Sequence, residues 1–205
     1  MKSISSFLLA LLLSMGTTSA KPNTHSKNSM NAEQGECPMQ LSMADNTEIS
    51  QWRTVLDGVM GGRSTGNRFA QDRHMTFKGS INTNGGGFSS IRRSASRGDM
   101  EGAEGLKLRI KQDGRSYRLT FRTSAVFRGR SISYQRPIPQ TPSGEWAEVT
   151  IPLSNFRTSI FGYEIPAPPF AANDVREIGV ILADGIDGPF QIDIAEISCV
   201  GSKAT

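Results

Sequence analysis

Residues 116–124 read SYRLTFRTS, with an apolar residue at every second position from Tyr117 to Phe121. A period of two places alternate side chains on opposite faces of a β-strand, whereas a helix repeats about every 3.6 residues. The stretch therefore predicts a strand that turns one apolar face to a core. Arg118, Thr120 and Arg122 fall together on its other face.

The same alternation recurs in runs that are separated by turn clusters such as NGGG at residue 84 and DGIDGP at residue 184. These runs are Met75–Phe77, Leu106–Ile110, Ile132–Tyr134, Trp146–Ile151, Ile178–Leu182 and Phe190–Ile194. No long helical pattern lies between them to build parallel βαβ units. We predict an all-β fold, an antiparallel β-sandwich of the jelly-roll type. Residues 161–170, FGYEIPAPPF, are too rich in proline for a central strand and predict a loop or an edge.

The first residues, MKSISSFLLALLLSMGTTSA, have the layout of a secretory signal peptide that ends near residue 20. Their apolar stretch is shorter than the ~20 residues of a membrane-spanning helix, and an uncleaved anchor is the alternative. Residues 21–36 are polar and aperiodic, which predicts a disordered leader. We expect one domain over residues 37–200 and a tail at 201–205. The protein should be exported, periplasmic or extracellular, with no membrane span in its mature chain.

The chain has two cysteines, Cys37 and Cys199, one near each end of the expected domain. In an oxidising compartment two such cysteines often pair, so we predict a disulfide that ties the ends of the domain together. Two separately buried thiols are the alternative.

The sequence offers little for catalysis. Only His74 of the two histidines lies in the expected domain, and no nucleophile motif is near it, which argues against a Ser-His-Asp site. Paired carboxylates for glycoside hydrolysis stay open, because sequence positions do not reveal their separation in space. The glutamates concerned are Glu145, Glu148, Glu164 and Glu177. We predict that the protein is not an enzyme.

Metal binding is weakly indicated. The chain has no HExxH motif and no paired CxxC motif, and one histidine cannot build an ordinary zinc site. Asp184, Asp187 and Asp193 carry the oxygen ligands that calcium prefers, although Asp and Gly are also the usual residues of turns. We predict no cofactor and no metal, with a structural calcium ion as the alternative.

Residues 57–66, DGVMGGRSTG, place four glycines around Val59 and Met60. A phosphate loop needs a following helix, and this stretch also lacks the GK[ST] ending. The glycines instead predict positive φ angles and close backbone approach at a corner of the sandwich. We expect Asp57 to bond backbone amides, and Arg63 and Ser64 to face outward. Met60 is expected to pack into the core or to contact a partner.

Basic residues gather between residues 109 and 136, where seven arginines occur. Tyr134 and Trp146 are close to them in the sequence. Arginine offers a planar fork for carboxylate, sulfate or phosphate groups, and aromatic rings stack on sugars. Arg118, Arg122, Tyr134 and Trp146 are therefore a candidate binding face for an anionic glycan or a protein. A solvated sheet face is the alternative, and nucleic acid is not expected for an exported protein.

Several motifs occur in a fixed order: Trp52, then DGVMGG at residue 57, NGGGF at residue 84 and DGPF at residue 187. On these motifs, and on EWAEVTIPLSNFRTS at residue 145, the chain resembles the thirty-kilodalton complex I intermediate-associated protein family from about Ser50 to Cys199. The resemblance implies a galactose-binding-like β-sandwich and a chaperone role in assembling respiratory complex I. The chain departs from the family at Phe161, where the family tends to hold Arg before the glycine.

Two functional hypotheses follow. The first is an exported binding module that binds a protein partner and assists assembly, and the second is a carbohydrate-binding module for an anionic glycan. An arginine-lined cleft would favour the glycan, and a shallow apolar patch would favour the protein partner.

Overall fold

The computed structural model describes residues 37–201. The predicted signal peptide, the predicted leader and residues 202–205 of the predicted tail lie outside the described residues. Within the described part, no helix has the length and apolar character that crossing a membrane requires.

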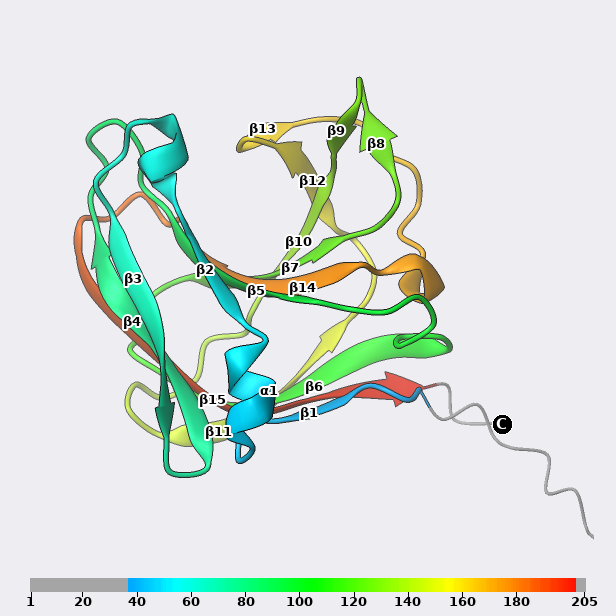
Figure 1. Ribbon diagram of the computed structural model, residues 1–205, viewed down its shortest axis with the longest axis horizontal. Coiled ribbons are helices and arrows are strands. Elements are labelled where there is room, and N and C mark those ends of the chain that lie inside the picture. The colour runs from blue at the N-terminus through cyan, green and yellow to red at the C-terminus, as the bar shows by residue number, and fades with distance from the viewer. Residues whose placement is uncertain (1–36, 202–205) are drawn as a thin grey trace, which may run out of the picture. The chain divides into compact units, whose positions relative to one another are not determined.

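Two antiparallel sheets form the described domain (Figure 1). Sheet A has the strand order β11 (Trp146–Pro152), β6 (Ala103–Gln112), β15 (Gly188–Gly201), β4 (His74–Ile81) and β3 (Thr65–Gln71), and β1 (Gln40–Ser42) pairs with β15. Sheet B has the order β13 (Tyr163–Glu164), β12 (Arg157–Ile160), β10 (Ser133–Pro137), β7 (Tyr117–Arg122), β14 (Glu177–Leu182), β5 (Ser89–Ser94) and β2 (Arg53–Leu56). The predicted antiparallel β-sandwich is confirmed.

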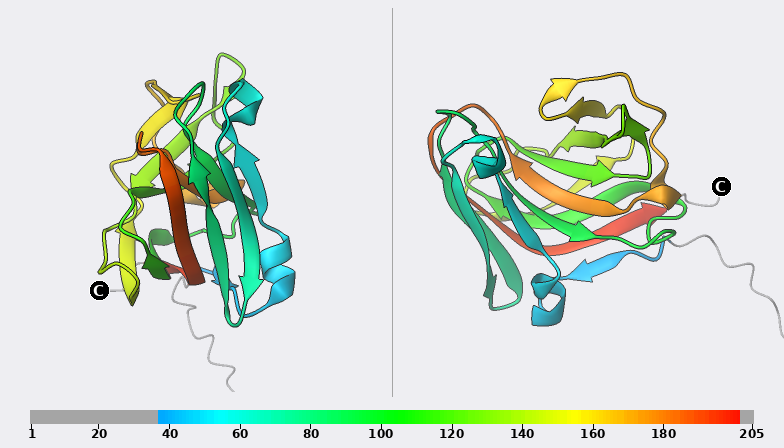
Figure 2. Two further views of the ribbon diagram at one scale, coloured as in Figure 1. Left: turned by 90° about the vertical axis from the view of Figure 1, so that its left-hand side faces the viewer. Right: turned by 45° about the horizontal axis from the view of Figure 1, so that its top comes forward.

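Short elements complete the domain. They are the helix α1 (Asn46–Ser50), the 3-10 turns η1 (Asp57–Met60) and η2 (Ala172–Asp174), and the ribbon of β8 (Val126–Phe127) and β9 (Arg130–Ser131). In the right-hand view of Figure 2, β14 (orange) of sheet B lies above β15 (red) of sheet A, as expected for two stacked layers.

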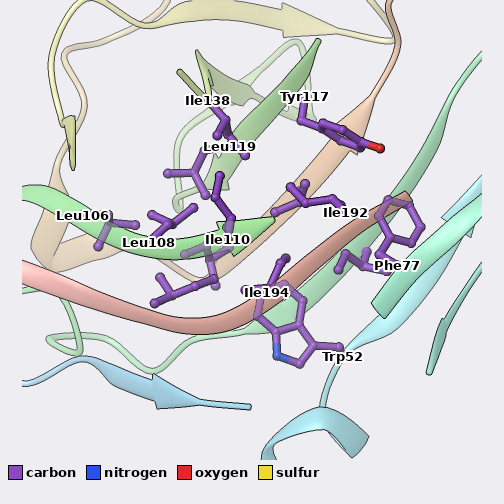
Figure 3. Packing of buried hydrophobic residues seen from close by; sticks show 14 of the residues in the cluster. Trp52, Phe77, Leu106, Leu108, Ile110, Tyr117, Leu119, Ile138, Ile192 and Ile194 are labelled. Atoms are coloured by element: carbon purple, nitrogen blue, oxygen red, sulfur yellow. The ribbon is translucent and has the colours of Figure 1, made fainter. Parts of the chain in front are cut away.

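The core lies between the sheets because the central strands, such as β6, β7, β14 and β15, turn apolar faces inward (Figure 3). Leu106, Leu108 and Ile110 of β6 are fully buried, and they face the inner side chains of β7. Burial of each large apolar side chain contributes about 1.5–3 kcal/mol. The alternation of SYRLTFR is reproduced on β7, where Tyr117, Leu119 and Phe121 are buried and the residues between them are only partly so.

The two ends of the described domain are joined. A disulfide links Cys37, just before β1, to Cys199 in β15, across 162 positions of sequence. The backbone N–H of Cys199 also donates to the carbonyl of Met39 at 2.9 Å. The proline-rich residues 161–170 contain only the two-residue edge strand β13, as their composition predicts.

Candidate binding cleft

A cleft of about 410 Å³ lies on the face of sheet B that points away from the core. Its floor comes from the outward residues of β7, β10, β12, β14 and β5, among them Arg118, Thr120 and Arg122. The turn η1 rises beside β2 at one side of sheet B, and β13 rises at the other (Figure 1). The polar strand face predicted from SYRLTFRTS is therefore the floor of this cleft.

The strand register sets one row of residues across the floor. Arg157 is opposite Gln135, Gln135 is opposite Thr120, Thr120 is opposite Gly179, and Gly179 is opposite Arg92. We call these five residues the floor row. A Cβ at Gly179 would lie 2.6 Å from the carbonyl oxygen of Ile91, 2.9 Å from the Thr120 hydroxyl and 3.1 Å from Cγ of Arg92. Glycine is therefore needed here because the backbone of β5 approaches β14 too closely for a side chain.

Positive charge dominates the cleft. Arg92, Arg118, Arg122 and Arg157 line it, and the lining residues in the described part include no lysine and no acid. Beside it, the single carboxylate of Glu177 pairs with Arg92 at 3.6 Å, with Arg122 at 3.3 Å, and with Arg53. Glu177 thus pairs with three guanidinium groups, and Glu164 pairs with Arg157 at 3.4 Å. The arginines outnumber these carboxylates, which leaves excess positive charge on this face.

The electrostatics of Arg92 reflect that excess. Burial, followed by repulsion from Arg122, lowers the pKa of Arg92 to about 10, although Glu177 acts in the opposite direction. An added anion would relieve this repulsion, because an opposite charge favours the charged form of a base. Arg118 differs from the other three lining arginines, because no carboxylate in the described part of the chain pairs with it.

Exposed apolar side chains stand on both sides of the cleft. Val59 and Met60 of η1 are 79% and 51% exposed, and we call them the first lip. Phe161, in the turn between β12 and β13, is 62% exposed and forms the second lip. Of the two expectations for Met60, core packing is wrong, because the 3-10 turn holds this side chain above the sheet.

The buried carboxylate of Asp57 holds the first lip in place. It accepts hydrogen bonds from the Ser64 amide at 3.0 Å, the Ser64 hydroxyl at 2.5 Å, the Gly87 amide at 2.6 Å and the Phe88 amide at 3.2 Å. We call this arrangement the Asp57 hub. Burial raises the pKa of Asp57, but these hydrogen bonds outweigh burial, and the pKa lies below its usual value. The hub ties η1 to the Gly85–Phe88 loop, and both segments border the cleft.

Two glycines of the family motifs make room for the hub. A Cβ at Gly62 would lie 2.3 Å from Cγ of Asp57, and a Cβ at Gly86 would lie 2.4 Å from its Oδ2. DGVMGG and NGGGF therefore belong to one structural unit, in which glycines from both segments enclose one carboxylate. Asp57 bonds backbone amides as expected, but two of the three come from the second segment.

The structure corrects the prediction for Ser64 and leaves Arg63 where it was expected. Ser64 does not face outward: its side chain is buried because its hydroxyl donates to Asp57 and accepts from the Asn82 amide at 3.0 Å. Arg63 is exposed, but it does not line the cleft.

Tyr134 is not a binding residue of the cleft. Its ring is buried against Phe156 and Phe170, and its hydroxyl donates to the carbonyl of Pro168 at 3.0 Å. Burial raises the pKa of Tyr134. The sequence already indicated that Tyr134 is buried, because its alternation with Ile132 places both side chains on the apolar face of the strand.

Trp146 lies on a different sheet from Arg118 and Arg122. It belongs to β11 of sheet A, where its ring contacts His74 at a centroid distance of 5.4 Å, with Arg109 and Lys111 over the ring. The predicted cluster of arginine, tyrosine and tryptophan is therefore divided between cleft, core and opposite sheet. Sequence proximity did not reveal this, because β10 and β11 leave the turn region in different sheets.

The three aspartates considered for calcium do not converge. Asp184 forms a two-bond pair with Arg115, with both distances at 2.7 Å, and Asp193 binds Lys111 at 2.8 Å. Asp187 accepts from the Thr83 amide at 2.6 Å. Across residues 37–201 no group of three or more acidic, histidine or cysteine side chains is placed to hold a metal ion.

The fold is that of the jelly-roll, galactose-binding-like class of β-sandwich, with one sheet face hollowed into a basic cleft. The sequence matches the family model described as Complex I intermediate-associated protein 30 (CIA30) over residues 41–194, and the chain belongs to that family. Among curated protein sequences, none matches this chain.

Two solved structures with a similar fold are family 11 carbohydrate-binding modules from Clostridium thermocellum. One, in complex with a β-1,3-1,4-mixed-linked tetrasaccharide, is 18% identical with a TM-score of 0.58, and the alignment covers 81% of this chain and 98% of that chain. The other, from the cellulosomal cellulase Lic26A-Cel5E, is 17% identical with a TM-score of 0.59, with coverage of 82% and 97%. At this identity the likeness shows the fold alone.

Proposed function

We propose that the protein is an exported, non-enzymatic binding module that holds a protein partner at the cleft of sheet B and assists its assembly. Membership of the CIA30 family supports an assembly role. The partner would be recognised by its own acidic surface, because the cleft presents four arginines and no acid among the described lining residues. Such complementarity steers encounter and selects partners.

The composition of the cleft and its lips carries this proposal. The centres of protein interfaces are enriched in Arg, Met and aromatic residues and depleted in Lys, Asp and Glu. The cleft follows that pattern, with Arg92, Arg118 and Arg122 between Met60 and Phe161. Aromatic residues and arginine are enriched among the residues that dominate binding energy at interfaces.

The test is co-purification of the protein from the envelope fraction of its cells. Wild-type protein should retain a reproducible partner, and Arg118→Gln and Phe161→Ala should lose it. Arg109→Gln is the matched control, because Arg109 is exposed on the outer face of sheet A. Equal recovery by the cleft variants and by wild type would rule out this cleft as the site.

An anionic glycan is the second candidate. The arginine-lined cleft is the feature expected to favour a glycan, whereas the exposed apolar lips favour the protein partner. Thr120, Ser133, Gln135 and Ser159 offer hydrogen-bonding groups between the arginines, and sugar hydroxyls use such groups. A glycan array with wild-type protein and with the Arg118→Ala/Arg122→Ala variant tests it. Absence of binding to every acidic glycan on the array would exclude this candidate.

A further inference from the structure

We infer that the cleft takes an extended acidic segment of a partner chain, which crosses the strands of sheet B and carries an apolar residue at each end. This inference rests on the proposed protein-binding function and specifies the chemistry of what is bound. Its basis is the order of groups across the sheet, which runs from apolar lip to basic floor to apolar lip.

The order follows from the strand order of sheet B. The first lip directly follows β2, since η1 begins at Asp57 and β2 ends at Leu56. Arg92 on β5 and the arginines of β7 come next, and Arg157 lies on β12 at the far side. Phe161 directly follows β12 and forms the second lip, four residues after Arg157.

The lips do not lie in the floor row itself. On β2, Arg53 is opposite Arg92 of the floor row, and η1 begins four residues after Arg53. On β12, Phe161 lies four residues after Arg157 of the floor row. Five antiparallel pairings separate β2 from β12, so the two lips lie beyond opposite sides of the row, and a segment that touches both crosses the row obliquely.

The arginines of β7 set where the acids belong. Arg118 lies two residues before Thr120 and Arg122 two residues after it, so they flank the floor row on its two sides. A segment that crosses the floor row at Thr120 passes between them, and acidic side chains near its middle reach both. Arg118 has no carboxylate partner within residues 37–201, so an incoming carboxylate can form a two-bond pair with it.

The floor also suits a peptide backbone. The amide nitrogen of Gln135 donates to the hydroxyls of Ser133 at 3.3 Å and Ser159 at 3.2 Å. Within the described residues no donor is bonded to its carbonyl oxygen, and this oxygen can accept a backbone N–H from the segment. The Thr120 hydroxyl lies at the neighbouring position of the floor row.

Fluorescence anisotropy with labelled synthetic peptides tests the inference. The probe is a seven-residue peptide with Leu at both ends and Asp at positions 3 and 5. One comparison peptide carries Asn in place of Asp, another carries Ser in place of Leu, and a heparin-derived sulfated tetrasaccharide is the non-peptide probe. The Asp peptide should bind at least tenfold more tightly than either comparison peptide.

Matched variants connect this binding to the cleft. Arg118→Gln should weaken the Asp peptide about tenfold and leave the Asn peptide unchanged, whereas Arg109→Gln should change neither. Glu177→Gln should tighten the Asp peptide, because it removes the carboxylate that pairs with Arg92 and Arg122. Circular dichroism of each variant checks that it is folded.

The outcomes separate this inference from the function on which it rests. Equal binding of the Asp and Asn peptides, or no dependence on Arg118, overturns the acidic segment but leaves a protein partner. A second outcome also overturns the acidic segment but leaves a protein partner: no peptide binds, while Arg118→Gln still abolishes recovery of the native partner. Binding of the tetrasaccharide alone overturns both and favours the glycan.

Discussion

Replacing Gly62 by alanine should disrupt the Asp57 hub without touching any of its hydrogen-bonding groups. The new Cβ would lie 2.3 Å from Cγ and 2.5 Å from Oδ1 of Asp57, far inside contact distance. The φ angle of Gly62 is outside the left-handed region, so the substitution adds a methyl group without backbone strain. Either the carboxylate or the loop must move.

The magnitude follows from what that movement breaks. Asp57 accepts four hydrogen bonds, and a hydrogen bond to a charged group contributes about 1.5–3 kcal/mol. Loss of one or two of them predicts a fall of about 3 kcal/mol in the free energy of unfolding. For a domain of this size that corresponds to about 6–12 °C in Tm.

Gly58→Ala is the matched control for this prediction. It lies in the same turn, its φ is also outside the left-handed region, and a Cβ there meets nothing within 4 Å. Its stability should stay within about 1 kcal/mol of wild type. Urea and thermal unfolding of both variants give the comparison, and a Gly62→Ala protein as stable as Gly58→Ala would refute the hub.

Three further predictions concern pH, the disulfide and Tyr134. Hydrogen bonds outweigh burial and hold the pKa values of Asp57 and Asp184 below the usual value. The stability that these two carboxylates contribute is complete above the unfolded-state pKa of ~3.9, and it is lost as pH falls through their lower pKa values in the folded protein. The urea midpoint of unfolding should therefore fall over this pH range, and it should fall less in Asp57→Asn. Replacing Cys37 and Cys199 by serine should cost about 5 kcal/mol and make Tm insensitive to reductant, unlike that of wild type. Tyr134→Phe should lose about 1 kcal/mol through the bond to Pro168, and an altered affinity at the cleft would contradict its place in the core.

The strands were predictable where apolar and polar residues alternate, as on β6 and β7. The strand β5 was harder to recognise, because it reads SSIRRS and buries Ser89 and Ser90 beside the single apolar residue Ile91. Small buried polar residues resemble a turn in the sequence, although here the Ser90 hydroxyl bonds the carbonyl of Val55 at 3.1 Å. Local pattern does not show which strand such residues pair with.

The candidate site was predictable only in part for a related reason. Arg118 and Arg122 share a strand face, which periodicity shows, but the partners of that face come from other strands. Arg92 reaches the cleft through pairing of β5 with β14, and Phe161 through the turn after β12. The glycine motifs indicated a tight corner, while the contact of Gly86 with Asp57 joins positions far apart in the chain. Pairing register and loop contacts of this kind are properties of the folded chain.

The affinity of the recovered protein partner for wild type, Arg118→Gln and Arg109→Gln tests the central claim most directly. Isothermal titration at two salt concentrations measures it without labels. An arginine cleft that binds an acidic partner predicts a loss of at least tenfold for Arg118→Gln, no change for Arg109→Gln, and weaker binding of wild type at higher salt. Equal affinities for all three proteins, with no effect of salt, would contradict the claim.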